Sequence, residues 1–172
     1  MRLVLPLLAL AAGCVPPSAE AAGSGLSYAL DPAKSALFVQ VFKDPSTLGS
    51  DLAHDHVILA TGWSGTVRLD AANPSICEAS LSIPVAGLKP DLPEMRTRVG
   101  YPVMLTDAQQ VQVAEHMRGA DQLDPSHFPQ ITFSSKTCTG SGADRVVAGS
   151  LAIHGVSTVS YTHLTLPTSD LV

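Results

Sequence analysis

A loop gives way to a strand in the stretch QLDPSHFPQITFSS, which runs from Gln122 to Ser135. Pro129 pushes Phe128 out of the helical region and into an extended conformation. A strand is predicted directly after it, because Ile131 and Phe133 fall on one face while the intervening polar residues fall on the other. The residues before this stretch are predicted to form strands and a helix, and the residues after it are predicted to form strands.

Alternating apolar and polar residues predict further strands, separated by turns rich in proline, glycine, asparagine and aspartate. The segment from Lys89 to Leu105 carries three prolines and is predicted to be irregular. The predicted strands are Leu26–Leu30, Ser35–Lys43, Val57–Asp70, Cys77–Val85, Ile131–Thr139 and Arg145–His154.

One helix is predicted within this series of strands. Thr106 is a candidate N-cap, and Gln109 stands three residues later, as in a capping box. The helix is expected to run from Asp107 to about Arg118, with Val113 and Met117 on a modest apolar face that covers a sheet. The predicted fold class is therefore mostly β, with antiparallel strands in a sandwich or barrel and one inserted helix.

Length and charge limit the classes of function. The chain has 172 residues, enough for one domain with a leader, and a net charge of −5. No run of Lys or Arg could follow a phosphate backbone, so we expect no nucleic-acid partner. The oligomeric state is not indicated.

The first residues are predicted to be a secretory signal, because Arg2 precedes an apolar segment, Leu3–Ala12, that is too short to span a bilayer. The sequence from Ala11 to Cys14 resembles a lipobox, which predicts a signal peptide at residues 1–13, a lipid on Cys14 and a flexible tether at residues 14–25. Cleavage at Ala19-Glu20-Ala21 is the alternative. Both cleavage sites predict a periplasmic location. Only the lipobox predicts a lipid anchor to the outer membrane.

Cysteine usage agrees with export. Once Cys14 is lipidated or removed, Cys77 and Cys138 remain as an even pair, and an oxidising compartment favours a disulfide between them. Their strand parity is opposite, so a bulge or frayed end is needed to bring them together. Two unpaired thiols are the alternative.

His54 and His56 are two apart and share one strand face, which suits a bidentate metal site. His116 and His154 are candidate distant ligands. The alternatives are a polar strand end or a polar mouth that hydrogen-bonds the head of a ligand, and His154 before Gly155 is more typical of a turn. No nucleophile motif, paired carboxylates or Cys-x-x-Cys motif is present, so we expect no enzyme activity and no required cofactor.

Four pieces of the chain, in their order and spacing, together resemble the YceI-like family of bacterial periplasmic proteins. They are Tyr28–Pro32 with Ser35, Gly62–Val67, Leu123-Asp124 with Phe128–Phe133, and Gly149–Val156. The resemblance implies a lipocalin-like antiparallel barrel of about eight strands whose apolar interior holds a polyisoprenoid chain, such as the tail of a quinone or a prenyl phosphate.

The resemblance makes the apolar strand faces candidate ligand contacts. The candidate residues are Phe38, Trp63, Leu81, Ile83, Val85, Ile131 and Phe133. The alternative is that these side chains fill a solid core, in which case the chain would be a cell-envelope scaffold and not a carrier.

The C-terminal residues 159–172 do not resemble the family's next strand, and they resemble the translation of a sequencing adapter. We therefore expect the YceI-like domain to occupy residues 26–158 and the tail to be non-native. A divergent strand is the alternative. A barrel that lacks its last strands should be incomplete and open.

Overall fold

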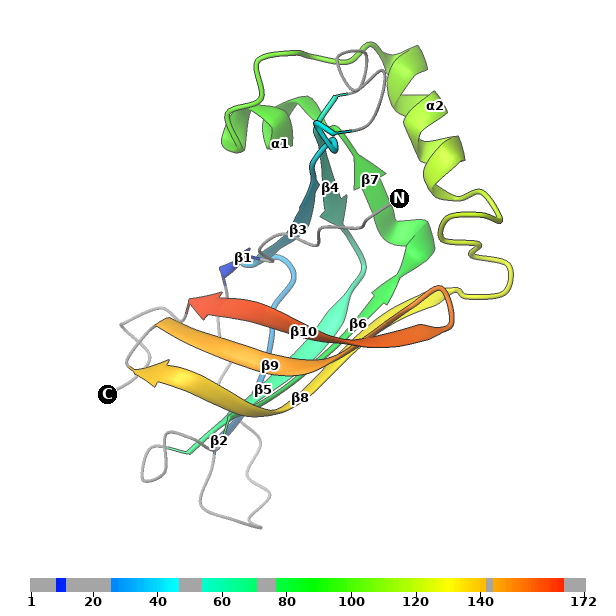
Figure 1. Ribbon diagram of the computed structural model, residues 1–172. Helices are drawn as coiled ribbons and strands as arrows, with labels where there is room; N and C mark the ends of the chain where they lie inside the picture. Colours follow the sequence, from blue (N-terminus) through cyan, green and yellow to red (C-terminus); the bar gives the residue numbers. More distant parts are fainter. Residues whose placement is uncertain (1–8, 12–25, 47–53, 71–76, 142–143, 166–172) are drawn as a thin grey trace.

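The computed structural model describes residues 9–11, 26–46, 54–70, 77–141 and 144–165. It is mostly antiparallel β structure, arranged as one sheet of ten strands (Figure 1). The order across the sheet is β2-β5-β6-β8-β9-β10-β1-β3-β4-β7. The strands are β1 (Ala9–Ala11), β2 (Leu26–Ala29), β3 (Ala36–Val41), β4 (His56–Ala60), β5 (Ser64–Leu69), β6 (Cys77–Pro84), β7 (Leu88–Pro90), β8 (Gln130–Ser141), β9 (Asp144–Ile153) and β10 (Val156–Thr165).

The sheet curves without closing. β2 and β7 are its two ends, and within the described residues they do not pair with one another. This confirms the predicted open, lipocalin-like barrel. Among the strands of the described residues, the only parallel pairing joins β1 to β10, and β1 also pairs antiparallel with β3.

Two strand breaks lie side by side and form the corner of the sheet. β4 and β5 are separated at Thr61–Trp63, and β6 is separated from β7 by a 3-10 helix, Val85–Gly87. The backbone N–H and the hydroxyl of Thr61 both donate to the carbonyl of Gly87, at 3.0 and 2.7 Å. Gly62 has a φ of +67°, a conformation that glycine adopts without strain. The prediction of one continuous strand over Val57–Asp70 was therefore wrong.

The predicted helix is present as α2 (Asp107–Met117), and both hydrogen bonds of the capping box at Thr106 and Gln109 are formed. A second helix, α1 (Pro93–Arg98), lies in the segment predicted to be irregular. Its Pro93 occupies the first helical turn, where the missing N–H costs nothing. In Figure 1 both helices stand at the same end of the molecule, beyond β4 and β7. In the described residues no helix has the length and apolar character needed to cross a membrane.

The buried apolar side chains form two clusters. The larger one includes Trp63, Val67, Leu81 and Phe133, and packs inside the curved sheet. The smaller one places Phe38, Val57 and Met95 between β3, β4 and α1. Leu37 and Ala60 belong to the larger cluster, so β3 and β4 have apolar neighbours on both faces.

The side chain of Asp91 is fully buried and joins α1 to β4. Its Oδ1 accepts from Nη1 of Arg96 at 2.5 Å and from the backbone N–H of Val57 at 3.2 Å, and its Oδ2 lies 2.6 Å from Nδ1 of His56. Arg96 is also buried, and it donates to the carbonyls of Asp55 and Val103. Burial alone would raise the pKa of Asp91, but hydrogen bonds from His56, Val57 and Arg96 outweigh it and lower that pKa below its ordinary value.

The cysteine pair meets through a bulge in β8. The pairing of β8 with β9 shifts register between Ser135 and Thr137. Before the shift Ser135 is buried, and after it Cys138 is buried, so the inward-facing parity changes. Cys138 thereby reaches Cys77, and the structure holds the two as buried thiols that hydrogen-bond to one another. The bulge required by the sequence pattern is confirmed, and the disulfide itself stays a prediction.

The β9–β10 hairpin turns at His154 and Gly155, which have φ values of +50° and +71°. Two consecutive positive φ values are the signature of a type I′ turn, which matches the twist of antiparallel strands. β10 pairs with β9 along its whole length, from Val156 to Thr165. Residues 1–8, 12–25 (which include Cys14) and 166–172 lie outside the described residues. The predicted domain boundaries and the lipid on Cys14 therefore stay predictions.

Replacing Asp91 with Asn should destabilise the protein by about 3–5 kcal/mol at neutral pH, because the buried guanidinium of Arg96 loses its countercharge. A carboxyl with a lowered folded-state pKa stabilises above the unfolded pKa, about 4, and loses that contribution as the pH falls through its folded-state pKa. The deficit of Asp91→Asn should therefore shrink below about pH 4. Urea unfolding at pH 7 and pH 3 measures both effects. Asp107→Asn, on the exposed first turn of α2, is the control and should cost about 1 kcal/mol or less; an equally small deficit for Asp91→Asn would contradict the assigned role.

Protein made in an oxidising compartment and denatured without reductant should show no free thiol from Cys77 or Cys138. Their disulfide would close a loop of about sixty residues and stabilise by roughly 4 kcal/mol. In fully reduced, folded protein both thiols should react slowly, because burial raises the pKa of Cys77 to about 12. Thiol titration measures both states. In Cys138→Ser, Cys77 has no partner for a disulfide and should react once the protein is denatured. Two reactive thiols beyond Cys14 in the unreduced, denatured protein would refute the bridge.

Candidate functional site

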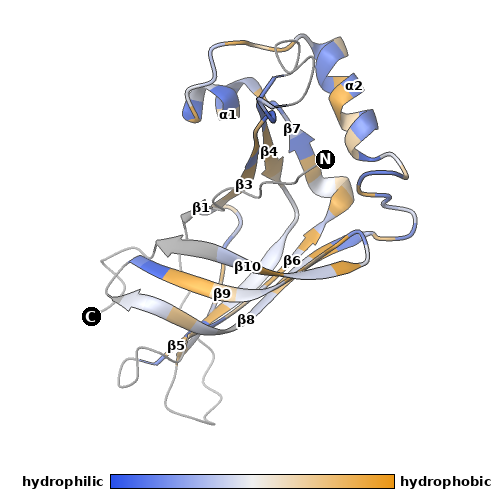
Figure 2. Ribbon diagram, viewed as in Figure 1, coloured by the Kyte–Doolittle hydropathy of each residue, from blue (hydrophilic) through white to orange (hydrophobic). Residues whose placement is uncertain are grey.

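An apolar cavity of about 690 Å³ lies inside the curved sheet. β3, β4 and β7 form its near wall, and β6, β8, β9 and β10 form its far wall. The end of α2 and the loop after it cover one side. Figure 2 shows apolar residues along parts of these strands. The apolar wall residues on strands are Leu37, Phe38, Val39, Val41, Ile58, Ala60, Leu81, Ile83, Leu88, Ile131, Phe133, Leu151 and Ile153.

Five of the seven side chains predicted to contact a ligand line this cavity. They are Phe38, Leu81, Ile83, Ile131 and Phe133. The other two, Trp63 and Val85, are buried in the larger core cluster and do not line it. The alternation of apolar and polar residues along β6 and β8 predicted their part of the far wall, because each of these strands has one apolar face.

Sequence reasoning named only Phe38 on the near wall and missed the rest of it. β3 presents Leu37, Val39 and Val41 to the cavity, and β4 presents Ile58 and Ala60. Both strands are apolar on both faces, so alternation alone does not say which face is the inner one. The register pairs Ile58 with Val39 and Ala60 with Leu37, which places these four side chains on one continuous surface.

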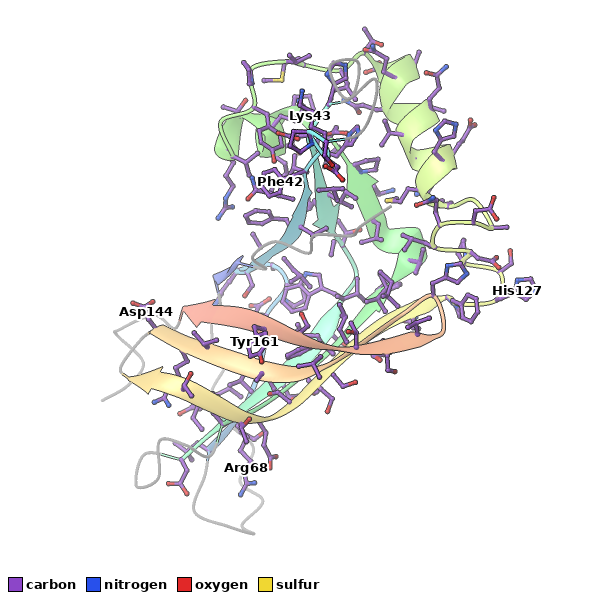
Figure 3. The ribbon with its side chains drawn as sticks, in the orientation of Figure 1. Phe42, Lys43, Arg68, His127, Asp144 and Tyr161 are labelled. Carbon is purple, nitrogen blue, oxygen red and sulfur yellow. The ribbon has the colours of Figure 1, made fainter. Side chains whose placement is uncertain are left out.

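The end of α2 covers one side of the cavity, as its modest apolar face predicted. Val113 and Met117 both line it, and Leu123 joins them from the following loop. Polar side chains gather here too: the cavity is also lined by Glu115, His116, Asp121, Gln122, Ser160 and Tyr161. Figure 3 labels Tyr161 on β10.

His56 is the polar group of the near wall. It begins β4 and has the same parity as Ile58 and Ala60, which places it at one end of their row. Its Nδ1 lies 2.6 Å from the buried carboxylate of Asp91, and 28% of its side chain is exposed. Sequence reasoning had no signal for this carboxylate, which stands thirty-five residues away in the segment predicted to be irregular.

Tyr101 supports the same network from the outside. Its ring lies 5.2 Å from the guanidinium carbon of Arg96, and its hydroxyl accepts from the side-chain amide of Gln40 at 3.1 Å. Burial raises the pKa of Tyr101, so this hydroxyl is protonated and neutral. Gln40, Tyr101, Arg96 and Asp91 are therefore linked in one polar cluster that includes Nδ1 of His56.

The predicted metal ligands do not converge. His54 is exposed, His56 engages Asp91, and the ring of His154 lies 4.8 Å from that of Phe128 in the β9–β10 turn. His116 lines the cavity from α2. In the part of the chain that the structure describes, no group of three or more His, Cys, Asp or Glu side chains could hold a metal ion.

The fold is similar to that of a solved structure. A crystal structure of BcnA from Burkholderia cenocepacia matches with a TM-score of 0.53 and 23% sequence identity, over 78% of this chain and 69% of that one. At this identity the similarity shows a common fold. No curated protein sequence matches the chain.

The family comparison extends across most of the sequence. The model of the YceI-like domain matches residues 28–168, which include every strand that lines the cavity. It spans the four pieces whose order and spacing carry the resemblance noted above. The chain belongs to the YceI-like family.

Proposed function

We propose that this protein binds and carries an apolar lipid of the polyisoprenoid type, held in the cavity between the two walls of the open barrel. The observation that carries the proposal is the cavity itself. Its volume of about 690 Å³ falls in the range of small-molecule sites, roughly 300–1,000 Å³. A scaffold with a filled barrel would have no such space.

The chemistry of the walls supports a lipid. Thirteen apolar strand residues line the cavity, and α2 adds Val113 and Met117. Burying each methylene of a ligand against such walls contributes roughly 0.8 kcal/mol. A long isoprenoid chain is nearly insoluble in water for the same reason, so moving it across an aqueous compartment requires an enclosed apolar site.

The proposed setting is the periplasm, and it depends on the N-terminal sequence alone. With a lipidated Cys14, the protein would stay at the membrane while residues 14–25 act as a tether. A carrier on a tether can exchange its cargo with that membrane without diffusing away, since the tether keeps the local concentration high.

Filling the cavity should remove the bound lipid. Leu151 lines the cavity from β9, whereas its neighbour Ser150 is exposed on the opposite face. Leu151→Trp should lower the amount of co-purifying lipid about tenfold or more, at a cost of roughly 1–3 kcal/mol in stability from overpacking. Mass spectrometry of organic extracts measures the lipid, and circular dichroism checks the fold.

Ser150→Trp is the matched control and should keep its lipid, because the added ring points away from the cavity. Wild-type protein that yields no stoichiometric lipid after mild purification, and binds no added isoprenoid, would refute the carrier function. Equal lipid in both tryptophan variants would place the lipid somewhere other than this cavity.

The lipid anchor has its own test. Replacing Cys14 with Ser should move the protein from the membrane fraction to the soluble periplasmic fraction, because a serine cannot form the thioether to the lipid. Cys77→Ser should stay with the membranes. If wild-type protein is already soluble, the cleavage site is Ala19-Glu20-Ala21 and the tether is lost with the leader.

A further inference from the structure

We infer that His56 is the contact for the head of the ligand, and that the cavity selects an uncharged lipid whose head donates a hydrogen bond, such as a primary alcohol or a phenol. This inference rests on the proposed lipid-binding function. It names the class of ligand, which the apolar walls alone leave open.

The tautomer of His56 follows from its buried partner. The pKa of Asp91 is lowered, so its carboxylate is ionised and can only accept hydrogen bonds. The 2.6 Å contact therefore requires that Nδ1 of His56 carries the hydrogen and donates. A carboxylate that fixes a histidine in this way also fixes the plane of the ring. In the uncharged imidazole, Nε2 is then a lone-pair acceptor.

Nε2 is the part of the ring left for a ligand. Asp91 is fully buried and covers the Nδ1 edge, while the side chain of His56 is 28% exposed and lines the cavity. Among the residues that the structure describes, Nε2 has no hydrogen-bond partner. A lipid with a hydroxyl head would bury that hydroxyl in apolar surroundings, which costs free energy unless a partner is present. His56 supplies such a partner at the end of the row formed by Ile58 and Ala60.

The charges around the cavity disfavour an anionic head. Glu115 and Asp121 line it, and in the described residues no Lys or Arg does. The guanidinium of Arg96 is buried and donates to Asp91 and to two backbone carbonyls, which leaves it directed away from a ligand. The guanidinium of Arg118 donates to the carbonyl of Leu88 at 3.4 Å, and Arg118 is not among the lining residues. A prenyl phosphate would therefore lose its hydration without gaining a cation in exchange.

Three probes with the same tail test the inference: geranylgeraniol, its methyl ether and geranylgeranyl phosphate. Binding is measured by calorimetry with cyclodextrin-solubilised probes at about pH 8.5, because histidine side chains change charge between about pH 5 and 8. Wild-type protein should bind the alcohol roughly five- to tenfold more tightly than the ether, which has no donor, as expected for one hydrogen bond. The phosphate should bind more weakly than both.

The preference should depend on His56. His56→Phe should bind alcohol and ether equally, and its binding of the ether shows that the cavity is intact. His56→Gln keeps an amide to donate to Asp91 and a carbonyl to accept from the ligand, so part of the preference should return. His127→Phe is the matched control, because His127 also pairs with a carboxylate, Asp124 at 2.7 Å, but lies outside the cavity. It should leave all three affinities unchanged.

The outcomes separate the two proposals. If none of the three probes binds, the lipid-binding function fails and this inference fails with it. If the alcohol and the ether bind equally to wild-type protein, or if His56→Phe keeps the preference, the cavity binds lipids but His56 does not select their heads. Tightest binding of the phosphate would overturn the electrostatic argument and the assigned ligand class.

Discussion

A carboxylate with no access to water must receive its hydrogen bonds from the protein. Asp91 is such a carboxylate, and its hydrogen bonds hold β4 and α1 together. Its partners are the ring of His56 and the backbone N–H of Val57, both at the start of β4, and the guanidinium of Arg96 in α1. Because the same carboxylate holds α1 in place and orients a cavity-lining ring, the stability of this end of the barrel and the polarity of the cavity are coupled. A substitution in the network changes both together.

Sequence patterns predicted the parts of the fold that local physics controls. The alternation around Ile131 and Phe133, the capping box at Thr106, and the turn at His154 all follow from neighbours a few residues apart. The family resemblance added the lipocalin-like barrel, and five of the seven side chains to which it pointed line the cavity. The parity conflict between Cys77 and Cys138 even predicted a bulge, because only a change of register could bring two residues of opposite parity to one side.

The features that sequence could not supply depend on long-range geometry. The odd-numbered residues from Val57 onward keep one parity through the corner at Gly62, yet Val57 packs against α1 while Val67 packs inside the barrel. The corner exchanges inside and outside, so the cavity wall on β4 is made by even-numbered residues, His56 among them. Likewise, apolar alternation cannot distinguish a filled core from a cavity, since both need the same inward faces.

The two halves of the sheet are connected in a way that bears on access to the cavity. In the hydrogen-bonded order, β10 and β3 are joined only through β1, whose three residues lie within the predicted signal peptide. In a chain cut after Gly13, this partner is gone, and β10 and β3 face one another as two strand edges. Both strands also contribute lining residues, Phe38 on one and Tyr161 on the other. Removal of a leader that ends at Gly13 would therefore leave the wall of the cavity without the strand that lies between β10 and β3.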